Sequence, residues 1–168
     1  MLNHLLIMRH AKSSWEFEDL SDHQRPLNKR GERSADVIAQ TLTTQGLAPD
    51  MIWCSDAERT SQTAKRLIRL IPGRQTVFYN PALYMASQGQ ILQICEQAGE
   101  PDDTDRLMIL AHNPGMAHLF EYFTKRTHNY PTAACAVFSR RNSGAHWLSS
   151  EAWQFRQLLL PRDLLRET

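Results

Sequence analysis

The chain has 168 residues, of which 42% are hydrophobic, and its 19 Lys and Arg nearly cancel its 18 Asp and Glu. This size predicts a single domain over 1–168 with one sizeable core. The balanced charge excludes a general electrostatic attraction to nucleic acid or to an acidic membrane, so any anion selectivity must be local.

The cysteines and the N-terminal residues further limit the classes of protein to which the chain can belong. The three cysteines form no CxxC pair and lack the spacing of metal ligands, which argues against a disulfide framework and against a zinc site: Cys54, Cys95 and Cys135. The first apolar run, Leu5 to Met8, is far too short for a signal peptide or a membrane span. We therefore expect a cytoplasmic protein.

Short apolar runs alternate with longer amphipathic stretches along the chain. Strands are predicted at Leu5–Met8, Met51–Cys54, Thr76–Tyr79, Leu107–Leu110 and Cys135–Phe138. Helices are predicted at Lys29–Leu47, Ala57–Ile71 and Gln88–Ala98, and Pro114 is expected to open a fourth. Strands and helices in alternation predict parallel strands with helical crossovers, hence an α/β sandwich.

Two later stretches leave structural questions open. The basic and aromatic stretch Phe123 to Pro131 is interpreted as a helix end and loop, and no nucleic-acid site is inferred from it. The C-terminal "QFRQLLLPRDLL" predicts a strand or a short helix, which packs across the sheet edge or contributes to an oligomer contact. The oligomeric state stays undetermined.

Basic side chains follow three of the predicted strands. Arg9 and His10 end the first strand, Arg59 lies in the first turn after the second, and His112 follows the fourth. In such sheets ligands bind beyond the carboxyl ends of the strands, so these side chains are expected at one rim. Arginine forks and helix N-termini suit phosphate oxygens, and a phosphoryl group is the predicted ligand.

Each of these residues also has an ordinary structural interpretation. Taken alone, His10 would be a hydrogen-bonded structural histidine, Arg59 a helix-surface arginine and His112 a helix-capping residue. Their joint placement at strand ends favours a site. The remaining histidines lack that setting and are assigned no chemistry: His4, His23, His118, His128 and His146.

Four motifs in this order and spacing resemble the histidine phosphatase superfamily, and within it the SixA-like phosphohistidine phosphatase branch: "LIMRHAKSSW", "DHQRPLNKRGERSA", "CSDAERTSQTA" and "LAHNPG". The resemblance implies a three-layer α/β/α, phosphoglycerate mutase-like fold with a mostly parallel sheet. It also implies that His10 is the nucleophile, with Arg9, Arg59 and His112 binding the phosphoryl group. Ala11 stands where the family usually has glycine.

Further residues receive supporting roles. Arg25 resembles another phosphate-binding element of the family, and Asp22 is expected to orient it; a purely structural salt bridge between them is an equally weighted alternative. Ser55 and Asn113 are expected to donate to the phosphate or to hold its ligands. The candidate general acids are Asp19, Asp22 and Glu58.

A general acid on an inserted lid, as in larger relatives, is missing. The stretch "PALYMASQGQILQICEQA" has no carboxylate before Glu96, which is expected to be solvated. An alkoxide leaving group needs a proton, whereas imidazole, with an ordinary pKa of about 6.5, leaves easily. The sequence therefore predicts a phosphatase that needs no metal or other cofactor and acts on phosphohistidine of a partner protein. The alternatives are a small-molecule phosphomonoesterase and a non-catalytic phosphate-binding module.

Overall fold

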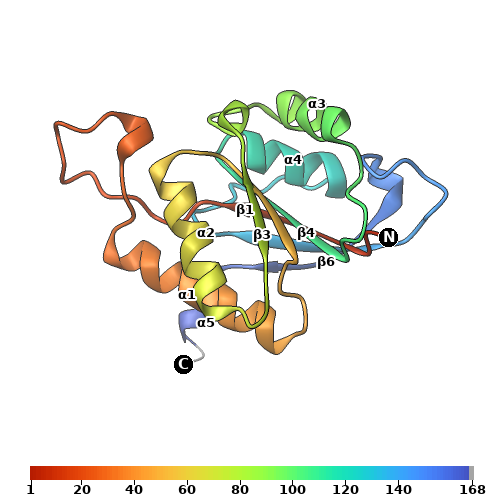
Figure 1. Cartoon of the computed structure of the whole chain (residues 1–168), viewed down its shortest axis with the longest axis horizontal. Helices are drawn as coiled ribbons and strands as arrows, with labels where there is room; N and C mark the ends of the chain where they lie inside the picture. The colour runs from red at the N-terminus through yellow and green to blue at the C-terminus, as the bar shows by residue number, and fades with distance from the viewer. Residues whose placement is uncertain (167–168) are drawn as a thin grey trace.

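The computed structural model describes residues 1–166, so residues 167–168 of the predicted domain lie outside the described residues. Six strands form one sheet in the order β3-β2-β4-β1-β5-β6 (Figure 1). They are β1 (His4–Arg9), β2 (Met51–Cys54), β3 (Thr76–Tyr79), β4 (Arg106–Ala111), β5 (Cys135–Arg140) and β6 (Trp153–Leu159). The first four are mutually parallel, and β5 is antiparallel to both of its neighbours. The predicted mostly parallel sheet is confirmed.

Within residues 1–166, five helices cover the two faces of the sheet. They are α1 (Lys29–Thr44), α2 (Glu58–Leu70), α3 (Gln88–Ala98), α4 (Gly115–Thr124) and α5 (Pro161–Arg166). Three short 3₁₀ helices, η1 (Asp22–Gln24), η2 (Pro81–Leu83) and η3 (Ser150–Ala152), lie in the connections. Helices α1, α2 and α5 lie on one face and α3 and α4 on the other, which completes the three layers (Figure 1).

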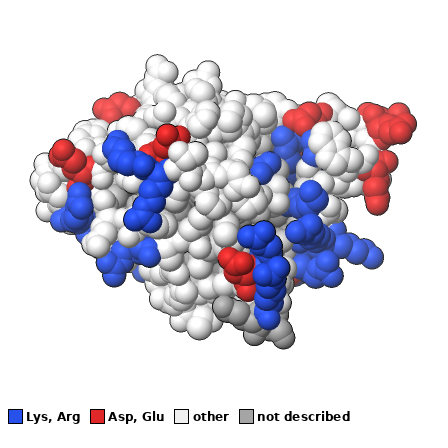
Figure 2. Space-filling model, turned by 180° about the vertical axis from the view of Figure 1, so that it is seen from behind, with Lys and Arg blue, Asp and Glu red and all other residues white. Residues whose placement is uncertain are grey.

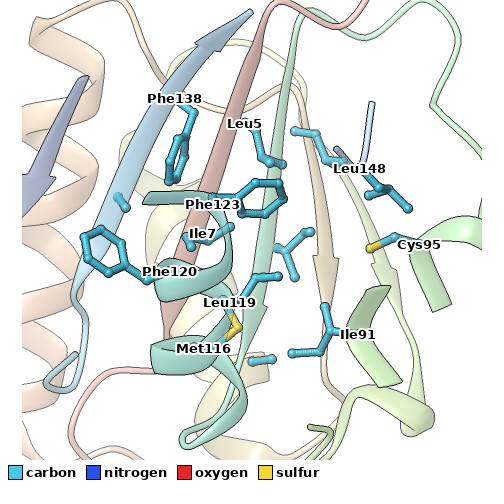
Figure 3. Packing of buried hydrophobic residues seen from close by; sticks show 14 of the residues in the cluster. Leu5, Ile7, Ile91, Cys95, Met116, Leu119, Phe120, Phe123, Phe138 and Leu148 are labelled. Atoms are coloured by element: carbon cyan, nitrogen blue, oxygen red, sulfur yellow. The ribbon is translucent and has the colours of Figure 1, made fainter. Parts of the chain in front are cut away.

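Alternation along β1 divides the core between these two faces. Leu5 and Ile7 point to the α3 and α4 side, where Phe120 and Phe123 pack, whereas Leu6 and Met8 point to the opposite side (Figure 3). These four residues of β1 are fully buried, as expected for a central strand covered on both faces. The cysteines are free and buried in these two clusters.

Helix α1 ends three residues before the predicted boundary. Gly46 has φ +70°, and the backbone N–H of Leu47 donates to Leu42 O at 2.8 Å, a left-handed C-terminal cap. The glycine therefore stops the helix as expected, but Leu47 already lies beyond it. At α4 the helix begins at Gly115, with Pro114 as its N-cap.

The C-terminal alternatives are both present in succession. Trp153–Leu159 forms β6, which pairs with β5 at the edge of the sheet, and Pro161 then opens α5. None of the described helices has the length and apolar character needed to cross a membrane.

Candidate active site

The C-terminal ends of β1, β2 and β4 meet at a cavity of about 240 Å³. Its lining residues are Arg9, His10, Lys12, Ser13, Trp15, Asp22, Arg25, Arg59, Met85, His112, Asn113 and Thr132. The four residues that the sequence places at strand ends are all among them. The parallel register of β1, β2 and β4 brings these ends together although the first and the last of the four residues, Arg9 and His112, are about one hundred positions apart in sequence.

His10 is held in one orientation by the backbone. Its Nδ1 lies 2.7 Å from Ala11 O, and because a carbonyl only accepts, Nδ1 carries the proton in this contact. Burial is the largest cause that lowers the pKa of His10 to about 3; the hydrogen bond opposes it in part, and the charges of His112, Arg9 and Arg59 act with it. The ring is therefore neutral at neutral pH, with the lone pair on Nε2.

His112 lies beside His10, with 5.2 Å between ring centroids. Its Nε2 lies 2.8 Å from Oγ of the fully buried Ser55, which also accepts a hydrogen bond from Ala57 N at 3.3 Å. If the Ser55 hydroxyl donates to Nε2, the proton of a neutral His112 ring resides on Nδ1. Burial first, and then Arg59, lower the pKa of His112 to about 3. Nδ1 is buried and has no hydrogen-bond partner among the described residues.

Two arginines supply positive charge to the cavity. Arg9 donates from Nη1 to Tyr130 O at 3.3 Å, and its buried Nε has no partner in the described part of the chain. Arg59, almost fully buried at the start of α2, donates to Asp22 O at 2.6 Å and to Asp22 Oδ2 at 3.0 Å. Burial and the neighbouring Arg59 charge lower the pKa of Arg9 from its ordinary value.

The Asp22 carboxylate connects Arg25 to Arg59. It accepts from Arg25 Nη1 at 2.7 Å, from Arg59 Nη2 and from the Tyr84 hydroxyl. These hydrogen bonds, that from Tyr84 foremost, lower the pKa of Asp22 to about 2. The predicted Asp22–Arg25 salt bridge is thus present, and both side chains also line the cavity.

Of the other predicted residues, Asn113 lines the cavity and Ser55 does not. Asn113 Nδ2 donates to Tyr130 O at 2.9 Å and its Oδ1 accepts from Ala117 N, so it ties the loop after β4 to neighbouring backbone. Ser55 instead lies behind His112. Glu58 is directed elsewhere, since its carboxylate accepts from Gln62 Nε2 at 2.9 Å and it is not among the lining residues. Glu96 is exposed on α3, 3.3 Å from His146.

Sequence reasoning missed Tyr84 and Trp15. The Tyr84 ring packs edge-on against His112, with centroids 5.4 Å apart, and the Trp15 ring lies under the Arg25 guanidinium, 3.4 Å from its carbon to the ring centroid. The contact of Tyr84 joins parts of the chain that are distant in the sequence, and no local pattern marks it. Trp15 ends the first of the quoted motifs, but the motif does not show that its ring lies on Arg25. Among residues 1–166, no group of three His, Cys, Asp or Glu side chains is arranged to hold a metal ion.

Comparison with solved structures shows the fold clearly. A candidate phosphohistidine phosphatase, SixA from Agrobacterium tumefaciens, is 24% identical with a TM-score of 0.79, covering 96% of this chain and 99% of its own. A corresponding SixA structure from Nakamurella multipartitia is 25% identical with a TM-score of 0.75, covering 95% and 96%. The protein histidine phosphatase SixA, solved with tungstate, is 20% identical with a TM-score of 0.78, covering 96% and 99%.

Curated relatives are themselves uncharacterized proteins. One, from Arabidopsis thaliana and described as chloroplastic, is 37% identical over 119 residues, which cover 66% of this chain and 54% of the relative. Another, from Mycobacterium tuberculosis, is 34% identical over 107 residues, covering 64% and 63%. The chain thus spans less than two thirds of the length of these relatives.

The family model of the histidine phosphatase superfamily (branch 1) matches residues 5–83, which include His10 and Arg59. The matched residues include the first three of the four motifs quoted above. The fold shared with the SixA structures extends over nearly the whole chain. Residues 5–83 are thus similar to the histidine phosphatase superfamily, and nearly the whole chain has the fold of the SixA structures.

Proposed function

We propose that this protein is a metal-independent phosphatase that uses His10 as its nucleophile and removes the phosphoryl group from phosphohistidine of a partner protein. The observation that carries the proposal is the buried, neutral His10 ring, fixed through Nδ1 so that Nε2 is the atom left for attack. It lies in a cavity with two arginines and a second histidine.

The reaction has two transfers. His10 Nε2 attacks phosphorus and forms an N–P bond while the P–N bond of the substrate breaks, and the departing imidazole nitrogen takes a proton from solvent. Water then attacks the phosphorus, the bond to Nε2 breaks, and inorganic phosphate leaves with the free enzyme restored. No metal step is needed, because fixed donors stabilise the charge on the transferred oxygens.

His112 acts in this proposal as a neutral hydrogen-bond donor. The Ser55 hydroxyl directed at Nε2 would leave Nδ1–H free for a phosphoryl oxygen, and Nδ1 is the ring atom without a partner among the described residues. Arg9 likewise has an unpaired Nε. Arg59 adds charge from the N-terminus of α2, and Arg25 and Asn113 complete the rim.

The available carboxylates favour an imidazole leaving group over an alkoxide. Asp22 is the one carboxylic acid among the described lining residues, and its pKa of about 2 keeps it ionised at neutral pH. Glu58 is bound to Gln62 away from the cavity. An alkoxide would lack a proton donor here, whereas imidazole leaves without strong acid assistance.

The test is phosphate release, with EDTA present, from a phosphohistidine peptide and from an alkyl phosphate. We expect fast release from phosphohistidine alone, and loss of that release in His10→Ala. Equal turnover of the alkyl phosphate would identify a small-molecule phosphomonoesterase. Retention of tungstate binding without turnover of either substrate would identify a phosphate-binding module and overturn the proposal.

A further inference from the structure

The segment Trp15–Leu20 projects from the body of the molecule beside the cavity (Figure 1). It carries three of the exposed large apolar side chains: Trp15, Phe17 and Leu20 are 76%, 52% and 37% exposed. Met85, which also lines the cavity, is 48% exposed. Exposed apolar groups gathered at one place are typical of an interaction surface.

The base of this segment is fixed, whereas its tip has only local contacts. Ser14 N donates to Pro26 O at 2.8 Å, and Ser13 bridges to Leu27, so the two ends are held together. Within the tip, Glu16 N donates to Ser14 Oγ and Leu20 N to Phe17 O. The apolar side chains are thus held outward on a fixed base without a described core to cover them.

The apolar surface is continuous with the phosphate-binding cavity. Trp15 lines the cavity, packs on Arg25 and is the first residue of the projecting segment. A partner whose phosphoryl group enters this cavity therefore comes close to Trp15 and to the segment that Trp15 begins. The same partner would cover both surfaces.

The segment also has a definite charge. Glu16, Glu18 and Asp19 are exposed, and none forms an ion pair with a described side chain. Figure 2, which shows the molecule from behind, has acidic side chains at the end of the molecule formed by this segment. These carboxylates repel a small polyanion and attract a surface with lysine or arginine.

From this combination we infer that Trp15–Leu20 is a docking loop for a phosphorylated protein that presents apolar and basic side chains next to its phosphohistidine. The inference rests on the proposed function and adds what the partner must display. Apolar contact with Phe17 and Leu20 supplies affinity, and the three carboxylates select the charge of the partner.

The experiment uses three phosphorylated probes and the full chain. Two synthetic peptides carry one phosphohistidine, flanked in the first by leucine and lysine and in the second by serine and glutamate; the third probe is phosphoimidazole. The wild type is expected to release phosphate from the first peptide with kcat/KM on the order of tenfold or more above that for the second.

Variants assign this preference to the loop. Phe17→Ser with Leu20→Ser should remove most of the preference through a higher KM, and leave turnover of phosphoimidazole unchanged, because neither side chain lines the cavity. Phe78→Ser is the matched control, since Phe78 is 54% exposed on β3 and outside the cavity lining. Glu18→Lys should likewise lower kcat/KM for the first peptide, and Glu121→Lys, on α4, should not.

Two results overturn the docking inference while the phosphatase stands: equal rates on the two peptides, or a preference that survives the double variant. A faster reaction with the serine and glutamate peptide would also overturn it and point to a basic docking surface. Absence of phosphate release from every probe, phosphoimidazole included, would instead overturn the proposed function itself.

Discussion

At the scale of residues, the site depends on two histidines that burial keeps neutral. Their pKa values of about 3 lie well below the ordinary value of 6.5, and desolvation is the largest cause in both. The neighbouring arginines act in the same direction, because a second positive charge is unfavourable near the first. Neutral imidazole at His10 is what a nucleophile requires, and neutral imidazole at His112 still donates one hydrogen bond.

We therefore predict that neither ring titrates between pH 8 and pH 5. In the folded chain, protonation of His10 and His112 is expected only near pH 3, whereas in the unfolded chain the same two rings take up protons near pH 6.5. The free energy of unfolding consequently decreases as the pH falls from about 6.5 toward 3. Carbon-13 NMR of the histidine Cε1 atoms measures the protonation of each ring directly, with His10→Asn and His112→Asn variants for assignment. A midpoint near 6.5 for either ring would contradict the prediction.

Tyr84 offers a second test at this scale. Its hydroxyl is the first cause of the low pKa of Asp22, so Tyr84→Phe should raise that pKa above about 2. The ring that packs on His112 is retained in this variant. Carboxyl carbon-13 titration reports the change, and Thr63→Val, which alters a hydroxyl that contacts Ala11 N instead, is a control expected to leave Asp22 unchanged. An Asp22 titration identical to that of the wild type in Tyr84→Phe would show that the hydrogen bond is without effect.

At the scale of elements, the site depends on close packing of α1 beneath the loop that follows β1. A Cβ added at Gly31 would lie 2.1 Å from Lys12 O, and Asn28 N donates to the same carbonyl at 3.1 Å. The helix therefore approaches the backbone two residues after His10 with no room for a side chain. Gly89, on α3, has nothing within 4 Å of the corresponding position.

These two glycines form a matched pair. Glycine to alanine in a helix ordinarily stabilises by up to about 1 kcal/mol. Gly89→Ala should leave the Tm unchanged or raise it slightly, whereas Gly31→Ala should lower the Tm by several degrees and reduce phosphatase turnover, because the Lys12 backbone must shift. Thermal unfolding followed by circular dichroism, alongside phosphate release, measures both. Equal Tm values for the two variants would show that the contact at Lys12 relaxes at no cost.

The elements themselves were largely predictable from the sequence. Apolar runs bounded by polar residues located five strands, and each of the four strands that precede helices ended where expected within two residues. Two properties of the structure could not be predicted from the sequence and became visible only in the fold. The antiparallel direction of β5 is one, because α4 lies between β4 and β5 and a strand–helix–strand order is typical of parallel strands. The hydrogen bond from Tyr84 to Asp22 is the other, because it joins residues 62 positions apart.

At the scale of the whole molecule, the sheet order explains why the site could be anticipated although most of its supporting contacts could not. Parallel β1, β2 and β4 are neighbours, so residues at their carboxyl ends converge. The positions of His10, Arg59 and His112 just after predicted strands were therefore sufficient to place them at one site. Glu58 shows what position in the sequence could not predict, namely the direction of a side chain. It adjoins Arg59 in sequence, but helical geometry turns its side chain toward Gln62, one turn further along α2.

The most direct test of the central claim is to trap the covalent enzyme during turnover. Wild-type protein mixed with phosphoimidazole and quenched in alkali, which preserves phosphohistidine, is digested and analysed by mass spectrometry. We expect phosphate on His10, bonded to Nε2 because Nδ1 is held by Ala11 O, and no phosphate in His10→Ala. Phosphate on another residue, the Nδ1 isomer at His10, or turnover with no covalent enzyme would contradict it.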